Sequence, residues 1–214
     1  MKTIYLIRHG QTESNLTSVT GRSTDPLPEL GRKQARLVAE RLRETTFTHI
    51  VSSTYARALE TGQAIAEVKN LEIELSPLFT EVKGPSEIEG TPHKDPTLLS
   101  VRQRRHELWG VKGEHISDEE NFFDVNERVY QALTFLEQHS GNIIAVTTHG
   151  AFMRGIVQHI LCGDQLTPAL STATYSRFFM NNTGISVIQF EEGKGWTLVC
   201  WNDTVHLDAS TVSA

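Results

Sequence analysis

The sequence predicts an α/β fold: a three-layer αβα sandwich with a mostly parallel central sheet and an antiparallel edge. Strand-like apolar runs alternate along the chain with helix-like periodic segments, which is typical of parallel sheets covered by helices on both faces. The run at residues 142–148 is almost continuously apolar and β-branched, as expected at the centre of such a sheet. Residues 185–190 and 196–201 are expected to form a hairpin, which predicts the antiparallel edge.

The first half of the chain supplies the alternation of strands and helices. A strand is expected at residues 4–7, followed by a polar loop with glycine and proline at 14–30. Between Ala35 and Leu42 apolar residues recur at i, i+3, i+4 and i+7, which indicates an amphipathic helix. The next expected elements are a strand at 48–53, a helix at 56–68 and a weak strand at 73–75.

The middle of the chain loses this regularity. Residues 83–120 contain several glycines and prolines and show no period, so we expect inserted loops that act as a lid and determine specificity. Beyond them the expected elements are a helix through 125–136, the strand at 142–148, a helix at 153–161 and the hairpin. The chain fits one domain, expected at 1–208, with residues 209–214 as a C-terminal tail.

Composition and charge argue against several classes of function. The net charge of −6 argues against nucleic-acid binding, although a locally positive pocket can still bind a small anion. Cys162 and Cys200 have no partner motif, and no metal or cofactor is expected. The N-terminus enters a strand without a signal-peptide segment, and no apolar stretch reaches bilayer length. We therefore expect a cytoplasmic protein with no membrane partner.

Polar residues gather where the predicted central strands end. Arg8-His9-Gly10 follows the first strand, and His149-Gly150 follows the strand at 142–148. Arg57 lies at the start of the helix after the second strand, and Glu81 lies just beyond the third. Because the carboxyl ends of parallel strands share one edge of a sheet, all four groups can face one crevice.

These side chains suit a phosphate group. Arginine supplies a fixed cation with a planar fork, and a neutral imidazole can attack phosphorus. The small polar residues Thr12 and Asn15 follow His9 at short spacing. A lone histidine at a strand end is more often structural, so the second arginine and the second histidine are what favour the functional interpretation.

The ordered motifs resemble the histidine phosphatase superfamily, in the branch similar to cofactor-dependent phosphoglycerate mutases and their small phosphatase relatives. The matching residues are R-H-G-x-T-x-x-N at 8–15, S-x-x-x-R-A-x-x-T at 53–61, Glu81, and T-H-G at 148–150. The resemblance covers nearly the whole chain in the same order. It implies a phosphoglycerate mutase-like fold.

The resemblance also implies roles for individual residues. His9 is the nucleophile that forms a phosphohistidine, Glu81 is the proton donor, and Arg8, Arg57 and His149 complete the catalytic set. The residues expected to bind the substrate phosphate are Arg8, Thr12, Asn15, Gly21, Arg57, His149 and Gly150. Nearby arginines would disfavour the protonated imidazole, and Gly10 and Gly150 would let phosphate oxygens approach the backbone.

The chain departs from the family pattern in two places. The family often has arginine before the catalytic glutamate, where this chain has Thr80, so Glu87 or Glu89 could compete with Glu81 as the proton donor. Pro28 stands where threonine is usual, so the helix near Ala35 is expected to lack its side-chain cap.

We expect a metal-independent phosphomonoester hydrolase. One alternative is a phosphoglycerate mutase, which uses the same pocket. Ser14 stands where such mutases usually have tryptophan, and no mutase-type insertion is evident in residues 83–120. The other alternative is a noncatalytic phosphate-recognition module, although such proteins commonly lose the nucleophilic histidine or an arginine, and this chain keeps both.

The substrate is expected to be a small phosphorylated metabolite whose organic part contacts residues 83–120. Arg102, Arg104 and Arg105 could bind a second anionic group of the substrate, but an exposed run of charge is the simpler interpretation. The edge of the final hairpin could also pair with a second copy of the chain in a homodimer.

Overall fold

The computed structural model describes all 214 residues and contains a six-stranded sheet in the order β3-β2-β4-β1-β5-β6. The strands are β1 (Lys2–Arg8), β2 (His49–Ser52), β3 (Ile73–Leu75), β4 (Ile143–Thr148), β5 (Ile185–Glu191) and β6 (Gly195–Asp203). The first four strands of this order run parallel, while β5 and β6 add antiparallel pairs beside β1. The predicted parallel sheet with an antiparallel edge is confirmed.

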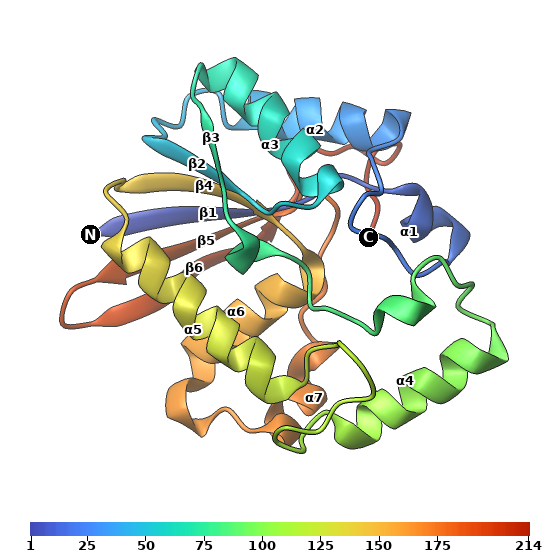
Figure 1. Cartoon of the computed structure of the whole chain (residues 1–214). Coiled ribbons are helices and arrows are strands. Elements are labelled where there is room, and N and C mark those ends of the chain that lie inside the picture. The colour runs from blue at the N-terminus through green and yellow to red at the C-terminus, as the bar shows by residue number, and fades with distance from the viewer.

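Helices cover both faces of the sheet, which gives the predicted three layers (Figure 1). The α-helices are α1 (Glu13–Thr17), α2 (Glu29–Arg41), α3 (Ala56–Lys69), α4 (Pro96–Leu108), α5 (Phe122–Gln138), α6 (Gly150–Cys162) and α7 (Pro168–Tyr175). Helices α2 and α3 pack on one face, and α5 and α6 pack on the other (Figure 1). No helix is both long enough and apolar enough to span a lipid bilayer.

The hydrophobic core lies on both sides of the sheet because successive side chains of a strand point to opposite faces. Leu6 of β1 is buried in the cluster with α5 and α6, whereas the next residue, Ile7, is buried in the cluster with α2 and α3. A strand covered on both faces needs apolar residues at every position, which explains the continuous run that predicted β4.

Helix α2 begins without a side-chain cap. Pro28 occupies the N-cap position, and its side chain cannot accept a capping hydrogen bond, as predicted from the proline in the sequence. The apolar stripe at Ala35, Val38 and Ala39 is buried against the sheet, so packing stabilises the helix that its N-terminus leaves uncapped.

Two predicted loops contain helices, which corrects the expectation for both. Helix α1 lies in the segment expected as a polar loop, and α4 lies in the segment expected to be aperiodic. Helix α4 buries only Leu98, so it has no apolar stripe for a period to reveal. Its start is encoded by Asp95, whose side chain caps Thr97 N, and by Pro96 in the first turn.

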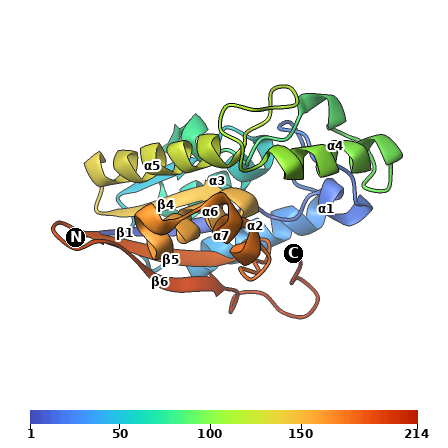
Figure 2. The same ribbon diagram turned by 90° about the horizontal axis from the view of Figure 1, so that it is seen from below.

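The segment 83–120 is fastened to the body of the protein at both ends. Near one end, Thr20 N donates to Thr91 O at 2.9 Å, and His93 N donates to Ser18 O at 2.8 Å. At the other end, the Glu120 carboxylate accepts a hydrogen bond from Arg128 Nε of α5 at 2.6 Å. Helix α4 is thereby held beyond the carboxyl ends of the parallel strands, on the same side as α1 (Figure 2).

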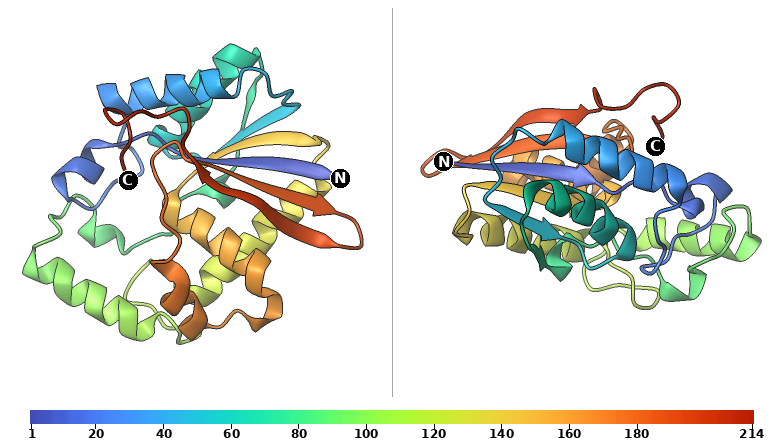
Figure 3. Two further views of the ribbon diagram at one scale, coloured as in Figure 1. Left: turned by 180° about the vertical axis from the view of Figure 1, so that it is seen from behind. Right: turned by 90° about the horizontal axis from the view of Figure 1, so that it is seen from above.

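The last residues, which the sequence predicted as a C-terminal tail, pack against the domain. Thr211 is fully buried, and its carbonyl accepts a hydrogen bond from Gln34 Nε2 at 2.6 Å. Asn182 N donates to Ser213 O at 2.8 Å. The segment lies along α2 (Figure 3), because the buried Gln34 amide needs partners there.

Gly31 is expected to be essential for the packing of α2 against the loop after β1. A Cβ atom on Gly31 would collide with Gln11 O, and one on Gly10 would lie 2.5 Å from Gly31 O. We expect Gly31→Ala to lower the free energy of unfolding by about 1–3 kcal/mol, measured by urea denaturation. Gly84→Ala is the control, since nothing lies within 4 Å of its added methyl group. Equal stability of the two variants would contradict this account.

Candidate active site

The register between β1 and β4 brings two histidines together. Arg8 pairs with Thr148 in this register, so the residues that follow, His9 and His149, leave adjacent strands at the same edge. His9 N continues the ladder by donating to Thr148 O at 3.0 Å. The two imidazole rings lie with their centroids 5.1 Å apart, as the sequence predicted for neighbouring strand ends.

Hydrogen bonds hold the His9 ring in one tautomer. Nδ1 lies 2.7 Å from Gly10 O, which can only accept, so Nδ1 carries the proton. Arg57 Nε donates to His9 Nε2 at 3.2 Å, so Nε2 carries a lone pair. The ring is buried with 4 % of its surface exposed, which leaves Nε2 oriented beside the Arg57 guanidinium.

His9 is neutral at neutral pH. Burial, and then the charges of Arg57 and Arg8, lower its pKa well below the ordinary value of 6.5, whereas the hydrogen bond to Gly10 O opposes the shift. A neutral imidazole with a fixed Nε2 lone pair is the protonation state that a nucleophile requires.

Arg57 lies in the first turn of α3, where the helix enters from the end of β2. Its Nη1 donates to Arg22 O at 2.7 Å, and its guanidinium lies 5.1 Å from the Tyr55 ring centre. Burial lowers the pKa of Arg57, and the charges of Glu81 and Asp25 oppose that shift. The side chain is therefore a fixed cation beside His9.

Arg8 supplies a second buried cation. Its Nη1 donates to Met180 O at 2.7 Å, and its Nε is buried without a protein partner. Burial lowers the pKa of Arg8 to about 10, against the charge of Glu81, so the group stays protonated at neutral pH. Gly150 is needed here because an added Cβ would lie 3.3 Å from Arg8 Nε.

His149 forms the N-cap residue of α6 and is fully buried. Its Nε2 lies 2.8 Å from Ser53 Oγ, whereas its Nδ1 has no protein partner. Burial, followed by the charges of Arg57, His9 and Arg8, lowers the pKa of His149 well below 6.5. Two neutral imidazoles therefore lie among buried arginines.

Glu81 lies at the N-terminus of α6. Its Oε1 accepts hydrogen bonds from Phe152 N at 3.0 Å and Val82 N at 2.9 Å, and Oε2 accepts from Ala151 N at 3.3 Å. Free N–H groups at a helix start favour a carboxylate. The position after β3 thus brings Glu81 to the same strand edge as the histidines, as predicted.

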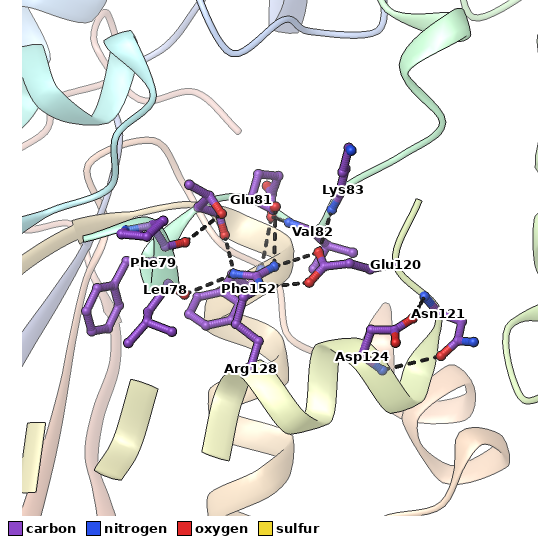
Figure 4. A network of polar contacts seen from close by, with 12 residues as sticks. Leu78, Phe79, Glu81, Val82, Lys83, Glu120, Asn121, Asp124, Arg128 and Phe152 are labelled. Carbon is purple, nitrogen blue, oxygen red and sulfur yellow. Dashed lines mark hydrogen bonds and ion pairs between the residues drawn. The ribbon is translucent and has the colours of Figure 1, made fainter. Parts of the chain in front are cut away.

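A half-buried ion pair holds the segment that carries Glu81 (Figure 4). Arg128 of α5 pairs with Glu120 through two hydrogen bonds, at 2.6 and 2.7 Å. The same guanidinium donates to Leu78 O and Thr80 O, at 3.0 and 2.9 Å, and stacks 4.2 Å from the Phe152 ring centre. Arg128 therefore fixes the backbone at Thr80, the position where the family often has its own arginine.

The other predicted donors lie less close to this cluster. Thr12 and Asn15 hydrogen-bond each other in a capping box at the start of α1, with Thr12 N donating to Asn15 Oδ1 at 3.1 Å. Gly21 lies in an exposed loop, where an added Cβ would be 3.0 Å from Ser14 Oγ. In the structure, glycine is required at position 10 because the backbone of Gly31 packs closely against it. From the sequence, Gly10 was instead related to the approach of phosphate oxygens.

The two competing acids are exposed and make no hydrogen bond to His9, His149 or the arginines. Glu87 is exposed and accepts a hydrogen bond from Ser117 Oγ at 2.9 Å. Glu89 is exposed too. Burial lowers the pKa of Arg57, and the charge of Glu89 is among those that oppose this shift. Neither carboxylate caps α6, so Glu81 is the acid whose hydrogen bonds fix it beside His149.

Sequence reasoning gave no role to three residues that build the site. Ser53 orients His149, Arg128 holds the Glu81 segment, and Asn182 Nδ2 donates to His9 O at 3.1 Å. The only sequence signal for any of the three was that Ser53 begins the S-x-x-x-R-A-x-x-T motif at 53–61. Arg128 and Asn182 act across long sequence separations that no local pattern reveals.

The assembled site can bind and attack a tetrahedral anion. Arg8 and Arg57 place guanidinium groups next to a neutral nucleophilic nitrogen, and Glu81 places a carboxyl group at the same edge. No group of three or more His, Cys, Asp or Glu side chains is arranged to hold a metal ion. The positive charge available to bind a phosphoryl anion in this site is therefore that of Arg8 and Arg57.

Comparisons with known proteins agree with this geometry. The family model of the histidine phosphatase superfamily (branch 1) matches residues 4–204. A Yersinia pestis protein named "Probable phosphoglycerate mutase GpmB" is 29% identical over 214 residues, covering 97% of this chain and 96% of that protein.

Solved structures extend the likeness. A mutant phosphoserine phosphatase from Entamoeba histolytica, in complex with phosphoserine, is 26% identical with a TM-score of 0.75, over 97% of this chain and 100% of the other. YhfR from Bacillus stearothermophilus shares the fold, with 24% identity and a TM-score of 0.80 over 96% and 99% of the two chains. Since the family model spans nearly the whole chain, the protein belongs to the histidine phosphatase superfamily, branch 1.

Proposed function

We propose that the protein hydrolyses phosphomonoesters of small metabolites without a metal ion, through a phosphohistidine on His9. The observation that carries this proposal is the pairing of Arg57 Nε with His9 Nε2 at 3.2 Å. A phosphoryl oxygen bound by this guanidinium is held beside the lone pair that attacks phosphorus. Phosphoryl transfer depends mainly on such positioning and on charge.

In the first half-reaction, the lone pair of His9 Nε2 forms a bond to phosphorus as the ester P–O bond breaks. The electron pair of that bond stays with the leaving oxygen, which takes a proton from the Glu81 carboxyl group. The bound phosphate dianion disfavours a second negative charge at Glu81, which favours the protonated acid at this stage. Gly10 O, 2.7 Å from Nδ1, stabilises the positive charge that develops on the imidazole.

In the second half-reaction, Glu81 is a carboxylate and takes a proton from water. The water oxygen bonds to phosphorus, the N–P bond breaks, and its electron pair returns to Nε2. Arg8, Arg57 and His149 bind the phosphoryl oxygens in both steps. Thr12, Asn15, Gly21 and Gly150 complete the predicted phosphate site.

Hydrolysis is favoured over mutase activity by Ser14 and by the 83–120 segment. Ser14 Oγ lies 2.9 Å from Thr12 Oγ1 within the α1 cap, where related mutases usually carry tryptophan. The relatives include both a protein named as a phosphoglycerate mutase and a phosphoserine phosphatase. Measuring both turnovers side by side separates the two activities, and hydrolysis is expected to be the faster.

Removal of the nucleophile tests the proposed chemistry. We expect His9→Ala to lower kcat/KM for an aryl phosphate at least about a thousandfold, since attack on phosphorus is lost. The wild-type rate should not change in a chelator. His115→Ala is the control, because His115 pairs with Asp124 at the surface. Hydrolysis that survives in His9→Ala would overturn the assignment, whereas a wild-type protein that hydrolyses no phosphomonoester would favour the noncatalytic alternative.

Substitution of the proton donor should depend on the leaving group. Glu81→Gln cannot protonate an alkoxide, so kcat/KM for an alkyl phosphate should fall about 10²–10⁴-fold. The loss should be much smaller for 4-nitrophenyl phosphate, whose leaving group departs as a stable anion. Glu87→Gln and Glu89→Gln serve as controls and should match the wild type. Equal losses on both substrates would show that Glu81 is not the donor.

The buried neutral histidines predict a pH-dependent stability. In the unfolded chain His9 and His149 titrate near 6.5, whereas in the fold their pKa values lie well below it. The contribution of the two neutral histidines to the free energy of unfolding is complete above pH 6.5 and is lost as the pH falls. Each should reduce the free energy of unfolding by up to about 1.4 kcal/mol per pH unit.

Histidine signals in NMR spectra, recorded between pH 7.5 and 5.5, check this prediction directly. The hydrogen bond to Asp124 raises the pKa of His115, so its signal should titrate above 6.5 and serves as an internal reference. The signals of His9 and His149 should not move. Titration of either one near 6.5 would contradict its neutral, buried state.

A further inference from the structure

A cavity of about 370 Å³ lies among helices α4, α5, α6 and α7. This volume is within the range of small-molecule pockets. The cavity adjoins Glu81. Val82, the next residue, lines it, and so does Ala151, whose N–H binds Glu81 Oε2 at 3.3 Å. The group that protonates the leaving oxygen must contact the leaving group. A leaving group in contact with Glu81 would therefore lie next to this cavity.

We infer that the cavity holds the organic part of the substrate, and that this part combines an apolar, ring-sized body with a second anionic group. The inference rests on the proposed phosphatase function and specifies its substrate class. It follows from the different chemistry of the two walls of the cavity, which α5 and α4 supply.

The α5 wall is mainly apolar, and its one polar side chain, Asn126, is hydrogen-bonded to His159 Nδ1 at 3.1 Å. Phe122, Val125 and Val129 face the cavity from this helix, and Trp109 joins them from the end of α4. The Trp109 and Phe122 rings pack edge to face, with centroids 6.4 Å apart, and each ring holds the other in place. A sugar or glycerol body would leave its hydroxyl groups without partners against this wall.

The α4 wall is cationic. Arg102, Arg105 and His106 lie at i, i+3 and i+4, so one face of the helix brings them to the cavity together. Arg105 is held in place by Lys83 O, at 3.2 Å from its Nη2, and its guanidinium lies 5.8 Å from the Trp109 ring centre. Its Nε is buried without a protein partner.

The acidic residues nearby are already engaged. Glu119 accepts hydrogen bonds from Ile116 N and Ser117 N, at 2.6 and 2.9 Å, and Glu120 pairs with Arg128. The cationic face of α4 is therefore free to attract an anion. Arg104, which the sequence grouped with these arginines, instead pairs with Glu107 at 3.0 Å at the surface.

The electrostatic couplings agree with a continuous site. Burial raises the pKa of Tyr175, which lines the cavity, and the charge of Glu81 raises it further. Burial lowers the pKa of Arg105, and acidic groups that include Glu81 oppose that shift. Glu81 also acts on Arg8 and Arg57, so its charge reaches both the phosphate side and the cavity side.

The test compares two substrates that differ by one charge, 4-carboxyphenyl phosphate and the neutral 4-carbamoylphenyl phosphate. For the wild-type protein we expect kcat/KM to favour the carboxylate about tenfold, as for a charge-assisted hydrogen bond. In Arg102→Ala the ratio should fall toward one. Arg104→Ala is the matched control, because it lies two residues along the same helix on a different face, and it should keep the wild-type ratio and rates.

A series of alkyl phosphates tests the apolar wall. From ethyl to butyl phosphate the leaving-group chemistry is nearly constant, so kcat/KM should rise about tenfold for two buried methylene groups. Trp109→Ala should flatten this series. A flat series in the wild type, or a carboxylate ratio that Arg102→Ala leaves unchanged, would overturn the inference.

These outcomes are distinct from failure of the proposed function. If the protein hydrolyses phenyl phosphate through His9 yet shows neither preference, the cavity assignment is wrong and the phosphatase proposal stands. If no phosphomonoester is hydrolysed at all, the proposed function itself fails. Circular dichroism and urea unfolding of each variant establish that a lost preference does not come from a lost fold.

Discussion

The parallel pairing of β1 with β4 is the constraint on which the site depends. Arg8 pairs with Thr148, and this register places His9 and His149 side by side as both strands leave the sheet. A slip of one residue would turn the side chains of β1 to the opposite faces and remove Leu6 and Ile7 from their clusters. The core that holds the register therefore also holds the two imidazoles in position.

Around this pair the protein builds a positive, desolvated pocket on a chain of net charge −6. Arg8 and Arg57 are fixed by backbone carbonyls of Met180 and Arg22, so their charges need not reorganise when an anion binds. The same charges and the burial keep His9 neutral. Glu81 supplies the opposing charge from the start of α6, where Arg128 and Glu120 hold its backbone. The proposed nucleophile and the proposed acid thus belong to separate elements of the fold.

Much of this arrangement could be predicted from sequence because it rests on local signals. The apolar run of β4 and the helical period from Ala35 to Leu42 predicted the layers, and the polar residues after the strands predicted the edge that carries the chemistry. Helix α4 gave no such signal, since it buries one side chain and draws its position from hydrogen bonds to distant backbone.

The contacts that complete the site depend on the tertiary fold. Gln34 with Thr211, Asn182 with His9, and Arg128 with Thr80 each join residues far apart in the chain. The burial of the final segment could not be predicted, because its partner, the buried Gln34 amide, lies far away in the sequence. Position in the fold, rather than residue type, also distinguishes Arg102 from Arg104.

The central claim is that His9 Nε2 bonds to phosphorus during turnover. Rapid mixing with a phosphomonoester, an alkaline quench and peptide mapping by mass spectrometry test this most directly. The account predicts an acid-labile phosphoryl group on the peptide that contains His9, formed and lost at rates that match turnover. Turnover with no phosphorylated protein, or a phosphoryl group on His149 instead, would contradict it.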